Sequence, residues 1–396
     1  MKNCLQTGSI DRSKSSPIHV FVLIDALGWQ VIKDRSFLNR ELTFRTPLKT
    51  VLGFSSGAIP SILTGLAPSR TGRWNLFYYD PVNSPFRWLR VLSALPDSLL
   101  NNRYVRKAIK ELGRRVLGMG PLFECGVSPR LLPWFNWSEK TSIYEAGGIA
   151  GSSSIFDLLR EADIDHKIYS YHTLSDLQIL ERAKIDIVAS NATCFFLYLS
   201  EVDHFLHGEC TDQTTVTDRL VWYEGQLREV FKLALQRNKA MTFTVISDHG
   251  MTPVHSRYDL VHDIQSLGFQ MPKQYLAVYD STMARYWFFD EGARKAVVKK
   301  LEGITCGRIL EDSHLDQLGI LFTDRRYGEV IFLLDPGWLV AQSDFNNDDW
   351  RPTGMHGYHP SDPHSDAVFL SNRDPHREMI TIMDIFPCLR EATSAA

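Results

Sequence analysis

Short apolar runs, rich in β-branched and aromatic residues, alternate with amphipathic stretches along most of this chain. Such alternation is typical of an α/β fold with a largely parallel sheet, because each buried strand needs a helical connection back across the sheet. Strands are expected at residues 19–24, 48–53, 167–170, 194–199, 242–247, 329–334 and 367–371. Helices are expected at residues 56–66, 155–162, 173–184, 214–236, 291–301 and 377–391.

Two stretches interrupt this alternation. Residues 75–140 are crowded with Trp, Phe, Pro and Arg, and we expect them to form a helical and aromatic cap over one edge of the core. Residues 274–340 contain β-rich pieces and are expected to form a small second lobe. We expect residues 1–17 to be a flexible N-terminus, and residues 18–396 to form one domain that carries both insertions.

Charge and cysteine content exclude several classes of protein. A net charge of -3 and a pI near 6.5 give no basic excess, so no nucleic acid polymer is expected as a partner. The six cysteines contain no CxxC pair, which argues against a zinc knuckle or a disulfide framework. The polar N-terminus lacks the apolar region of a signal peptide, and this predicts a cytoplasmic location.

Polar residues follow four of the apolar runs at the point where each run ends. Asp25 follows HVFVLI, Ser55 follows LKTVLGF, Asp203 follows FFLYLSEV, and Asp248 and His249 follow TFTVIS. A single carboxylate in such a place usually caps the next helix or turn. Four such positions together favour a ligand site, because open α/β sheets bind ligands at the carboxyl ends of their strands.

The spacing of these residues favours metal binding. Asp203 and His207 would lie one helical turn apart on the same face, so one carboxylate and one imidazole can hold one ion. The segment TGMHGYHP adds His356 between two glycines, which permit an unusual backbone path. Three Asp and three His in all suit two divalent ions, zinc in the first place and manganese as the alternative. Two such ions can stabilise both oxygens of an in-line phosphoryl displacement.

A rival interpretation concerns the string formed by Gly53, Ser55 and Gly57. This G-x-S-x-G pattern after a strand resembles the nucleophile elbow of an α/β-hydrolase esterase. Too few strands precede it, however, no HGGG-type oxyanion loop is visible, and the other ligand motifs would stay unexplained. A third class is a binding protein that keeps the fold but has lost the chemistry, and the intact set of ligands argues against it.

Five segments resemble, in this order, the metal and nucleophile motifs of the alkaline phosphatase superfamily, closest to its nucleotide pyrophosphatase and type I phosphodiesterase branch. They are VLIDALGWQVI, SSGAIPSILTGLAPSRTG, LYLSEVDHFLHG, VISDHGM and GMHGYHP. The resemblance implies an alkaline-phosphatase-like α/β sandwich whose catalytic domain covers residues 18–396. It also implies two metal sites, one formed by Asp25, Asp248, His249 and the Ser55 oxygen, and the other by Asp203, His207 and His356.

The resemblance further implies that Ser55 is the nucleophile, with Ser56 as the alternative if the register slips by one residue. The reaction would be hydrolysis of phosphodiester or pyrophosphate bonds, with nucleotides among the substrates, through a phosphoseryl intermediate. Phosphomonoesterase or phosphotransferase activity is the alternative within the superfamily. Asn75 is assigned to contact a phosphoryl oxygen, with Arg73 as the alternative, and Ala58 stands where many phosphodiesterase members have Asn.

The cap offers a substrate hypothesis of its own. Between residues 81 and 130 there are nine Lys or Arg and three Asp or Glu, interleaved with aromatic residues. Such a cap is compatible with a small anionic substrate that has an apolar part, a lipid-linked phosphate, or contact with a membrane surface. The alternative is a structural insertion that buries its aromatics and leaves a solvated basic face.

Overall fold

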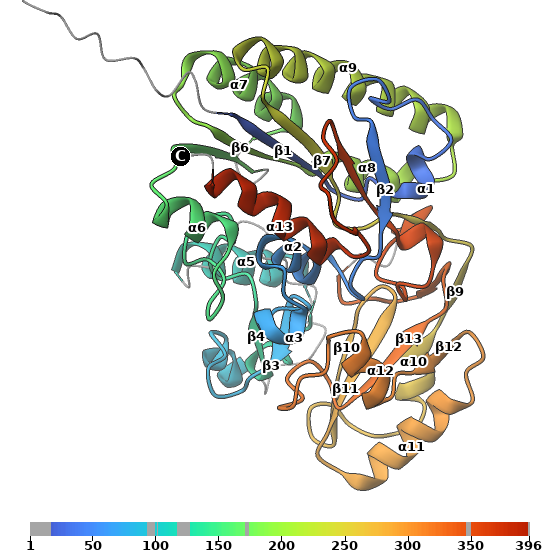
Figure 1. Cartoon of the computed structure of the whole chain (residues 1–396). Coiled ribbons are helices and arrows are strands. Elements are labelled where there is room, and N and C mark those ends of the chain that lie inside the picture. The colour runs from blue at the N-terminus through green and yellow to red at the C-terminus, as the bar shows by residue number, and fades with distance from the viewer. Residues whose placement is uncertain are drawn as a thin grey trace, which may run out of the picture.

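The computed structural model describes residues 17–92, 100, 102–116, 127–170, 174–345 and 350–394, without the side chains of residues 92, 103, 106, 114 and 116. Its core is a three-layer arrangement in which helices cover both faces of a six-stranded sheet (Figure 1). The predicted α/β class is therefore confirmed. The predicted flexible N-terminus, residues 1–17, lies outside the described residues except for Pro17.

The central sheet is mixed and mostly parallel. Its strands β5, β6, β1 and β7 pair in parallel, whereas β16 runs antiparallel to both β7 and β2. In spatial order the strands are β2 (Phe44–Leu48), β16 (Ala367–Ser371), β7 (Thr242–Ile246), β1 (His19–Ile24), β6 (Cys194–Leu199) and β5 (His166–Tyr169). The parallel strands end at one edge, so the residues that follow them are brought together.

The alternation of side chains along β1 shows why both faces are covered. Val20, Val22 and Ile24 belong to one hydrophobic cluster, and Phe21 and Leu23 belong to the cluster on the opposite face. The first face is covered by α1 (Trp29–Ile32), α7 (Asp176–Ala189), α8 (Glu201–Glu209) and α9 (Gln213–Arg237). The second face is covered by α2 (Ser55–Thr64), α6 (Ile155–Glu161) and α13 (Ile385–Arg390). In the described part of the chain, no helix has both the length and the apolar character needed to cross a bilayer.

Three predicted elements are wrong in their bounds, and one of them is the helix expected at 173–184, which is α7 at Asp176–Ala189. The strand expected at 48–53 is β2, which ends at Leu48, and its Pro47 is tolerated because β2 lies at an edge of the sheet. The helix expected at 377–391 begins only with a 3₁₀ turn at Ile382–Asp384. The residues before that turn run beside Lys49, whose amide donates to the Ile380 carbonyl and whose carbonyl accepts from the Ile382 amide.

A second sheet lies beside the first, within residues 274–340 (Figure 1). It is antiparallel, in the order β10 (Tyr275–Tyr279), β11 (Met283–Phe288), β13 (Val330–Leu334) and β12 (Gly307–Ile309). Its helices are α10 (Leu260–Gln265), α11 (Glu291–Glu302) and α12 (Asp312–Gln317). Short two-stranded pairs join β9 (Ser256–Tyr258) to β14 (Trp338–Val340) and β8 (Thr252–Pro253) to β15 (Gly354–Met355).

The cap segment packs on this second sheet. Phe86, Phe135 and Trp137 of the cap are buried in one cluster with Leu276 and Trp287 of the sheet. These aromatic side chains of the cap are therefore structural, which agrees with the alternative hypothesis of an insertion that buries its aromatic residues. Its described elements are α3 (Pro68–Thr71) at its entrance, β3 (Phe77–Tyr79), a 3₁₀ helix at Arg87–Leu92, α5 (Arg103–Val116), a 3₁₀ helix at Leu132–Trp134 and β4 (Phe135–Trp137).

A buried arginine of the second sheet, Arg285, pairs with Asp280 of the same sheet region and also contacts the cap. The Arg285 guanidinium is fully buried and donates from Nε to Asp280 at 2.7 Å and from Nη1 to the Phe77 carbonyl at 2.8 Å. Removal of one partner would leave the other charge buried and unpaired, which costs about 3–5 kcal/mol. We therefore expect Arg285→Met to lower the free energy of unfolding by about that amount in urea titrations.

The matched control is Lys295→Met. The Lys295 amino group lies 3.9 Å from Glu291 on the surface, and such pairs contribute about 0–1 kcal/mol. A loss below about 1 kcal/mol for Arg285→Met would contradict the structural role of the buried pair.

His19 makes stability depend on pH. It is the first residue of β1, and burial, together with the charge of Arg373, lowers its pKa from 6.5 to about 4. Between these values the unfolded chain binds a proton that the folded chain does not bind. Stability is therefore expected to fall as the pH drops from 6.5 to 4, by at most about 3 kcal/mol.

The His19→Gln variant should lose this part of the pH dependence when urea unfolding is measured across that window. A chelator in every sample removes any contribution from metal release. The control is His376→Gln, because the His376 side chain is 89% exposed. Equal pH dependence in the wild type and His19→Gln would show that His19 is not the titrating group.

Candidate active site

The first donor group lies where two neighbouring strands end. Asp25 follows β1 directly, and Asp248 and His249 follow β7 after one intervening residue. Their ligand atoms lie within 4.8 Å of one another, and Nε2 of His249 is 3.2 Å from Oδ2 of Asp248 and 3.5 Å from Oδ1 of Asp25. The two loops come this close because Gly28 faces Gly250, where a Cβ on Gly28 would lie only 2.6 Å from the Gly250 Cα.

Ser55 lies at this first group. It is the first residue of α2, and its Oγ is 3.0 Å from Nε2 of His249. Ser56, the alternative nucleophile, is buried and donates its hydroxyl to the Trp74 carbonyl at 2.9 Å. The geometry therefore favours Ser55 over Ser56.

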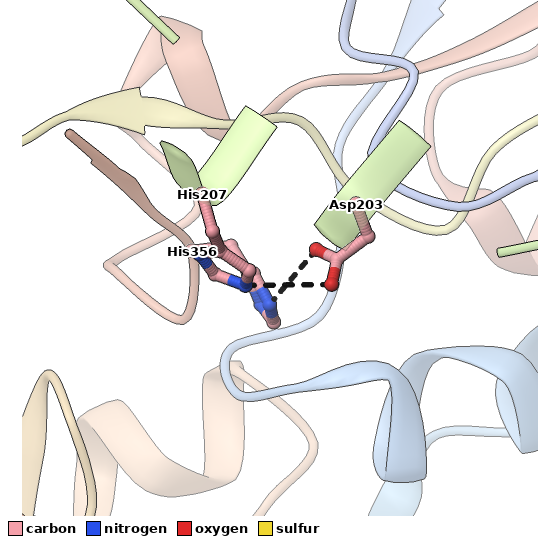
Figure 2. A group of neighbouring side chains, drawn as sticks. All are labelled: Asp203, His207 and His356. Carbon is pink, nitrogen blue, oxygen red and sulfur yellow. Dashed lines mark ion pairs between the residues drawn. The ribbon is translucent and has the colours of Figure 1, made fainter. Parts of the chain in front are cut away.

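The second donor group joins α8 to the loop after β15. Asp203 and His207 lie one turn apart on α8, and Nε2 of His207 is 3.3 Å from Oδ2 of Asp203. Nε2 of His356 is 3.3 Å from the other oxygen of Asp203. Figure 2 shows both imidazoles directed at the one carboxylate. These two groups have the same members as the two metal sites that the resemblance implies.

The two groups are in contact with each other. The rings of His249 and His356 are stacked with centroids 3.8 Å apart and planes 15° apart. One histidine comes from each group, so the two groups are adjacent. Such adjacency is what a two-ion phosphoryl-transfer site requires.

The hydrogen bonds of the histidines determine which ring nitrogen is available to a metal. Nδ1 of His249 lies 3.0 Å from the Gly250 carbonyl, and Nδ1 of His207 lies 2.8 Å from the Gly354 carbonyl. A carbonyl accepts only from N–H, so in the neutral rings Nε2 carries the lone pair and faces the carboxylates. Backbone partners of this kind orient metal-binding histidines.

The carboxylates also have oxygens without partners. Oδ1 of Asp25, Oδ1 of Asp203 and Oδ2 of Asp248 are buried without a hydrogen bond. Because the lone pair on Nε2 of His249 faces Asp25 and Asp248, a cation between these atoms would satisfy both the carboxylate oxygens and the imidazole. The residues therefore fit two divalent ions with mixed nitrogen and oxygen ligands.

The shifted pKa values of the site residues also favour cation binding. Burial raises the pKa of Asp25 well above its usual range, and the charges of Asp248 and Asp203 raise it further. Burial and then the neighbouring His249 lower the pKa of His356 to about 4, so its imidazole stays neutral. Burial would also raise the pKa of Asp203, but His207 and His356 outweigh it and hold that pKa well below its usual range.

Two supporting residues escaped the sequence predictions. The Tyr198 hydroxyl donates to Oδ2 of Asp25, and the Thr50 hydroxyl donates to the Asp248 carbonyl at 2.6 Å. Both hydroxyls hydrogen-bond a member of the first donor group without belonging to that group, and so help to orient it. The available signal was the polar tip of Tyr198, one residue before the carboxyl end of an otherwise apolar strand.

Asn75 is buried near the nucleophile turn. Its Oδ1 has no hydrogen-bond partner and lies 3.4 Å from the position of a Cβ on Gly53, two residues before Ser55. Arg73, the alternative, donates instead to the Gly148 carbonyl at 2.7 Å and to the Thr141 hydroxyl at 3.1 Å. Asn75 therefore contacts the nucleophile turn, whereas Arg73 contacts other residues. That Asn75 binds a phosphoryl oxygen stays a prediction.

Two candidate metal-donor groups and a serine hydroxyl at the carboxyl edge of a mostly parallel sheet are the arrangement expected of an α/β metallohydrolase. The family model of type I phosphodiesterase/nucleotide pyrophosphatase matches residues 19–359, and the chain belongs to this family of enzymes. No curated protein sequence matches the chain.

Solved structures share the fold at low sequence identity. Murine ectonucleotide pyrophosphatase/phosphodiesterase 5 is 15% identical, with a TM-score of 0.67 over 96% of this chain and 95% of that chain. The human protein of the same name is 13% identical, with a TM-score of 0.66 over 96% and 95%. An inactive form of the murine protein in complex with AMP is 15% identical, with a TM-score of 0.67 over 96% of both chains.

Proposed function

We propose that this enzyme hydrolyses phosphodiester or pyrophosphate bonds by transferring the phosphoryl group to Ser55. The observation that carries the proposal is the Ser55 hydroxyl, 3.0 Å from His249 at the first donor group. The second donor group adjoins it through the stack of His249 on His356. Two adjoining groups that could hold divalent ions, with a nucleophile at one of them, would suit in-line displacement at phosphorus.

In the proposed reaction, Ser55 Oγ forms a bond to phosphorus as the bond from phosphorus to the leaving oxygen breaks. The hydroxyl proton is released and the leaving oxygen takes up a proton, so a phosphoseryl ester and a free alcohol or phosphate result. Water then cleaves the ester and restores Ser55. Divalent ions, when bound, lower the pKa of the hydroxyl and neutralise charge on the phosphoryl oxygens.

The chain contributes further stabilisation at the start of α2. Ser55 is the first residue of this ten-residue helix, so the positive end of the helix dipole faces the phosphoryl oxygens. Zinc is the proposed metal and manganese the alternative, because each group mixes imidazole nitrogen with carboxylate oxygen.

The AMP complex of the inactive murine relative supports nucleotides as one substrate class for this chain. The cap supports contact with a membrane surface in addition. The side chains of Trp88, Val91 and Tyr104 are exposed, and Lys and Arg residues are close to them in the sequence. Arg106 and Arg114 are further basic residues of the cap, and their side chains lie outside the described part of the structure.

The esterase alternative draws on the same contact between Ser55 and His249. A serine esterase needs an acidic partner at Nδ1 of its histidine, whereas Nδ1 of His249 meets the Gly250 carbonyl. The structure thus favours metal chemistry. Activity that survives exhaustive chelation would favour the esterase.

The test is a panel of bis-p-nitrophenyl phosphate, p-nitrophenyl phosphate, dinucleotides and nucleoside triphosphates, each assayed with zinc and with manganese. We expect metal-dependent turnover in which the diesters exceed p-nitrophenyl phosphate. A preference for the monoester would instead support the phosphomonoesterase alternative. No turnover of any substrate by metal-replete enzyme would overturn the proposal.

A further inference from the structure

A cavity of about 170 Å³ adjoins the second donor group, with His207 and His356 in its wall. The rest of its wall is mainly apolar. Its apolar members are Phe54, Leu76, Phe345, Trp350 and Met355, and its polar members are Asp280 and Ser281. We refer to it as the apolar cavity. It begins next to the nucleophile, because Phe54 immediately precedes Ser55 and its ring lies 5.4 Å from that of His356. A group attached to a phosphate at the site can therefore reach it.

The charge of the wall limits what the cavity can hold. Among the residues that the structure describes, the wall contains no Lys or Arg. Within the described part of the chain, the one carboxylate of the wall is that of Asp280, which Arg285 neutralises at 2.7 Å and 3.2 Å. Additional phosphates would find no cation there and would lose their hydration, whereas an apolar group would gain from leaving water.

We propose that the apolar cavity receives an alkyl or aryl substituent of the phosphodiester, so that this enzyme favours hydrophobic phosphodiesters over polyphosphates. The inference rests on the proposed function, since the phosphate must lie at the donor groups for its substituent to enter the cavity. The size is sufficient, because a cavity of roughly 150 Å³ lined by apolar side chains can hold benzene. Full burial of each methylene is worth up to about fourfold in binding.

The kinetic test uses methyl, butyl and hexyl p-nitrophenyl phosphates with zinc-loaded enzyme. We expect kcat/KM to rise at least about 30-fold from the methyl to the hexyl ester. Two comparison substrates are ATP and thymidine p-nitrophenyl phosphate, called the thymidine ester, and the hexyl ester should exceed both. Turnover without dependence on chain length would overturn the inference and leave the proposed function standing. Faster turnover of the thymidine ester would assign the cavity to a nucleoside and also overturn it. No turnover of any ester would overturn both.

Two variants test whether the dependence on chain length arises in the apolar cavity. Leu76→Trp should fill the cavity and bring the ratio of hexyl to methyl kcat/KM close to one, and Phe345→Ala should lower the same ratio. Leu235→Trp is the matched control, because Leu235 is 41% exposed on α9, outside the cavity wall, and the ratio should stay at the wild-type value. An unchanged ratio in both Leu76→Trp and Phe345→Ala would place the selectivity elsewhere.

A binding measurement gives a readout independent of turnover and of mutant folding. Calorimetry with wild-type enzyme should show hexylphosphonate binding at least about tenfold more tightly than methylphosphonate, with a more negative heat-capacity change. Equal affinity and equal heat-capacity change for the two phosphonates would overturn the proposal.

Discussion

Replacement of Ser55 by alanine is expected to lower kcat for bis-p-nitrophenyl phosphate at least about 10³-fold. The variant loses the oxygen that would attack phosphorus. The adjacent Ser56 hydroxyl is not placed to substitute for it, because Ser56 is buried and donates to the Trp74 carbonyl at 2.9 Å. Metal content, measured by elemental mass spectrometry, should stay near that of the wild type, since three protein ligands remain in the first group.

Ser56→Ala is the matched control, on the adjacent residue of the same helix. It removes one hydrogen bond and should cost about 1 kcal/mol of stability with little change in kcat. Acid quenching during turnover, followed by peptide mass spectrometry, should find the phosphoryl adduct on Ser55 in the wild type. A phosphorylated Ser56, or full activity in Ser55→Ala, would refute Ser55 as the nucleophile.

Replacement of His207 by alanine is expected to remove one of two bound ions. His207 and Asp203 hold the second group from one face of α8, and the remaining pair would not retain a divalent ion at micromolar concentration. Metal content should fall from about two ions per chain to about one. Activity should fall by more than the roughly 10–100-fold that loss of an outer hydrogen-bond partner costs.

His204→Ala provides the comparison, because His204 lies on the same helix but is exposed. Metal content and kcat should stay close to wild type. Thermal unfolding adds a second measurement, since ions that bind only the folded chain raise its Tm with concentration. If His207→Ala kept two ions and a wild-type Tm response to zinc, the second donor group would not be a metal site.

The strands of the central sheet were largely predictable from the sequence. β1, β6 and β16 have the predicted bounds, because strands buried on both faces read as unbroken apolar runs. The position of β2 was predicted wrongly, because an edge strand needs no unbroken apolar run and tolerates Pro47. The helix expected at 377–391 was too long, because pairing beside Lys49 overrides the helical pattern of its first residues.

The sequence by itself determined the chemistry of the site. Ligand identity depends on residue type, and parallel strands bring their carboxyl ends to one edge, so Asp25, Asp203 and Asp248 had to converge. Only the tertiary structure decided how the two donor groups adjoin each other and which cavity lies beside them. The ring stack of His249 on His356 and the apolar cavity join segments that lie far apart in the chain. Their shape depends on side-chain packing between those segments, and no local pattern encodes such packing.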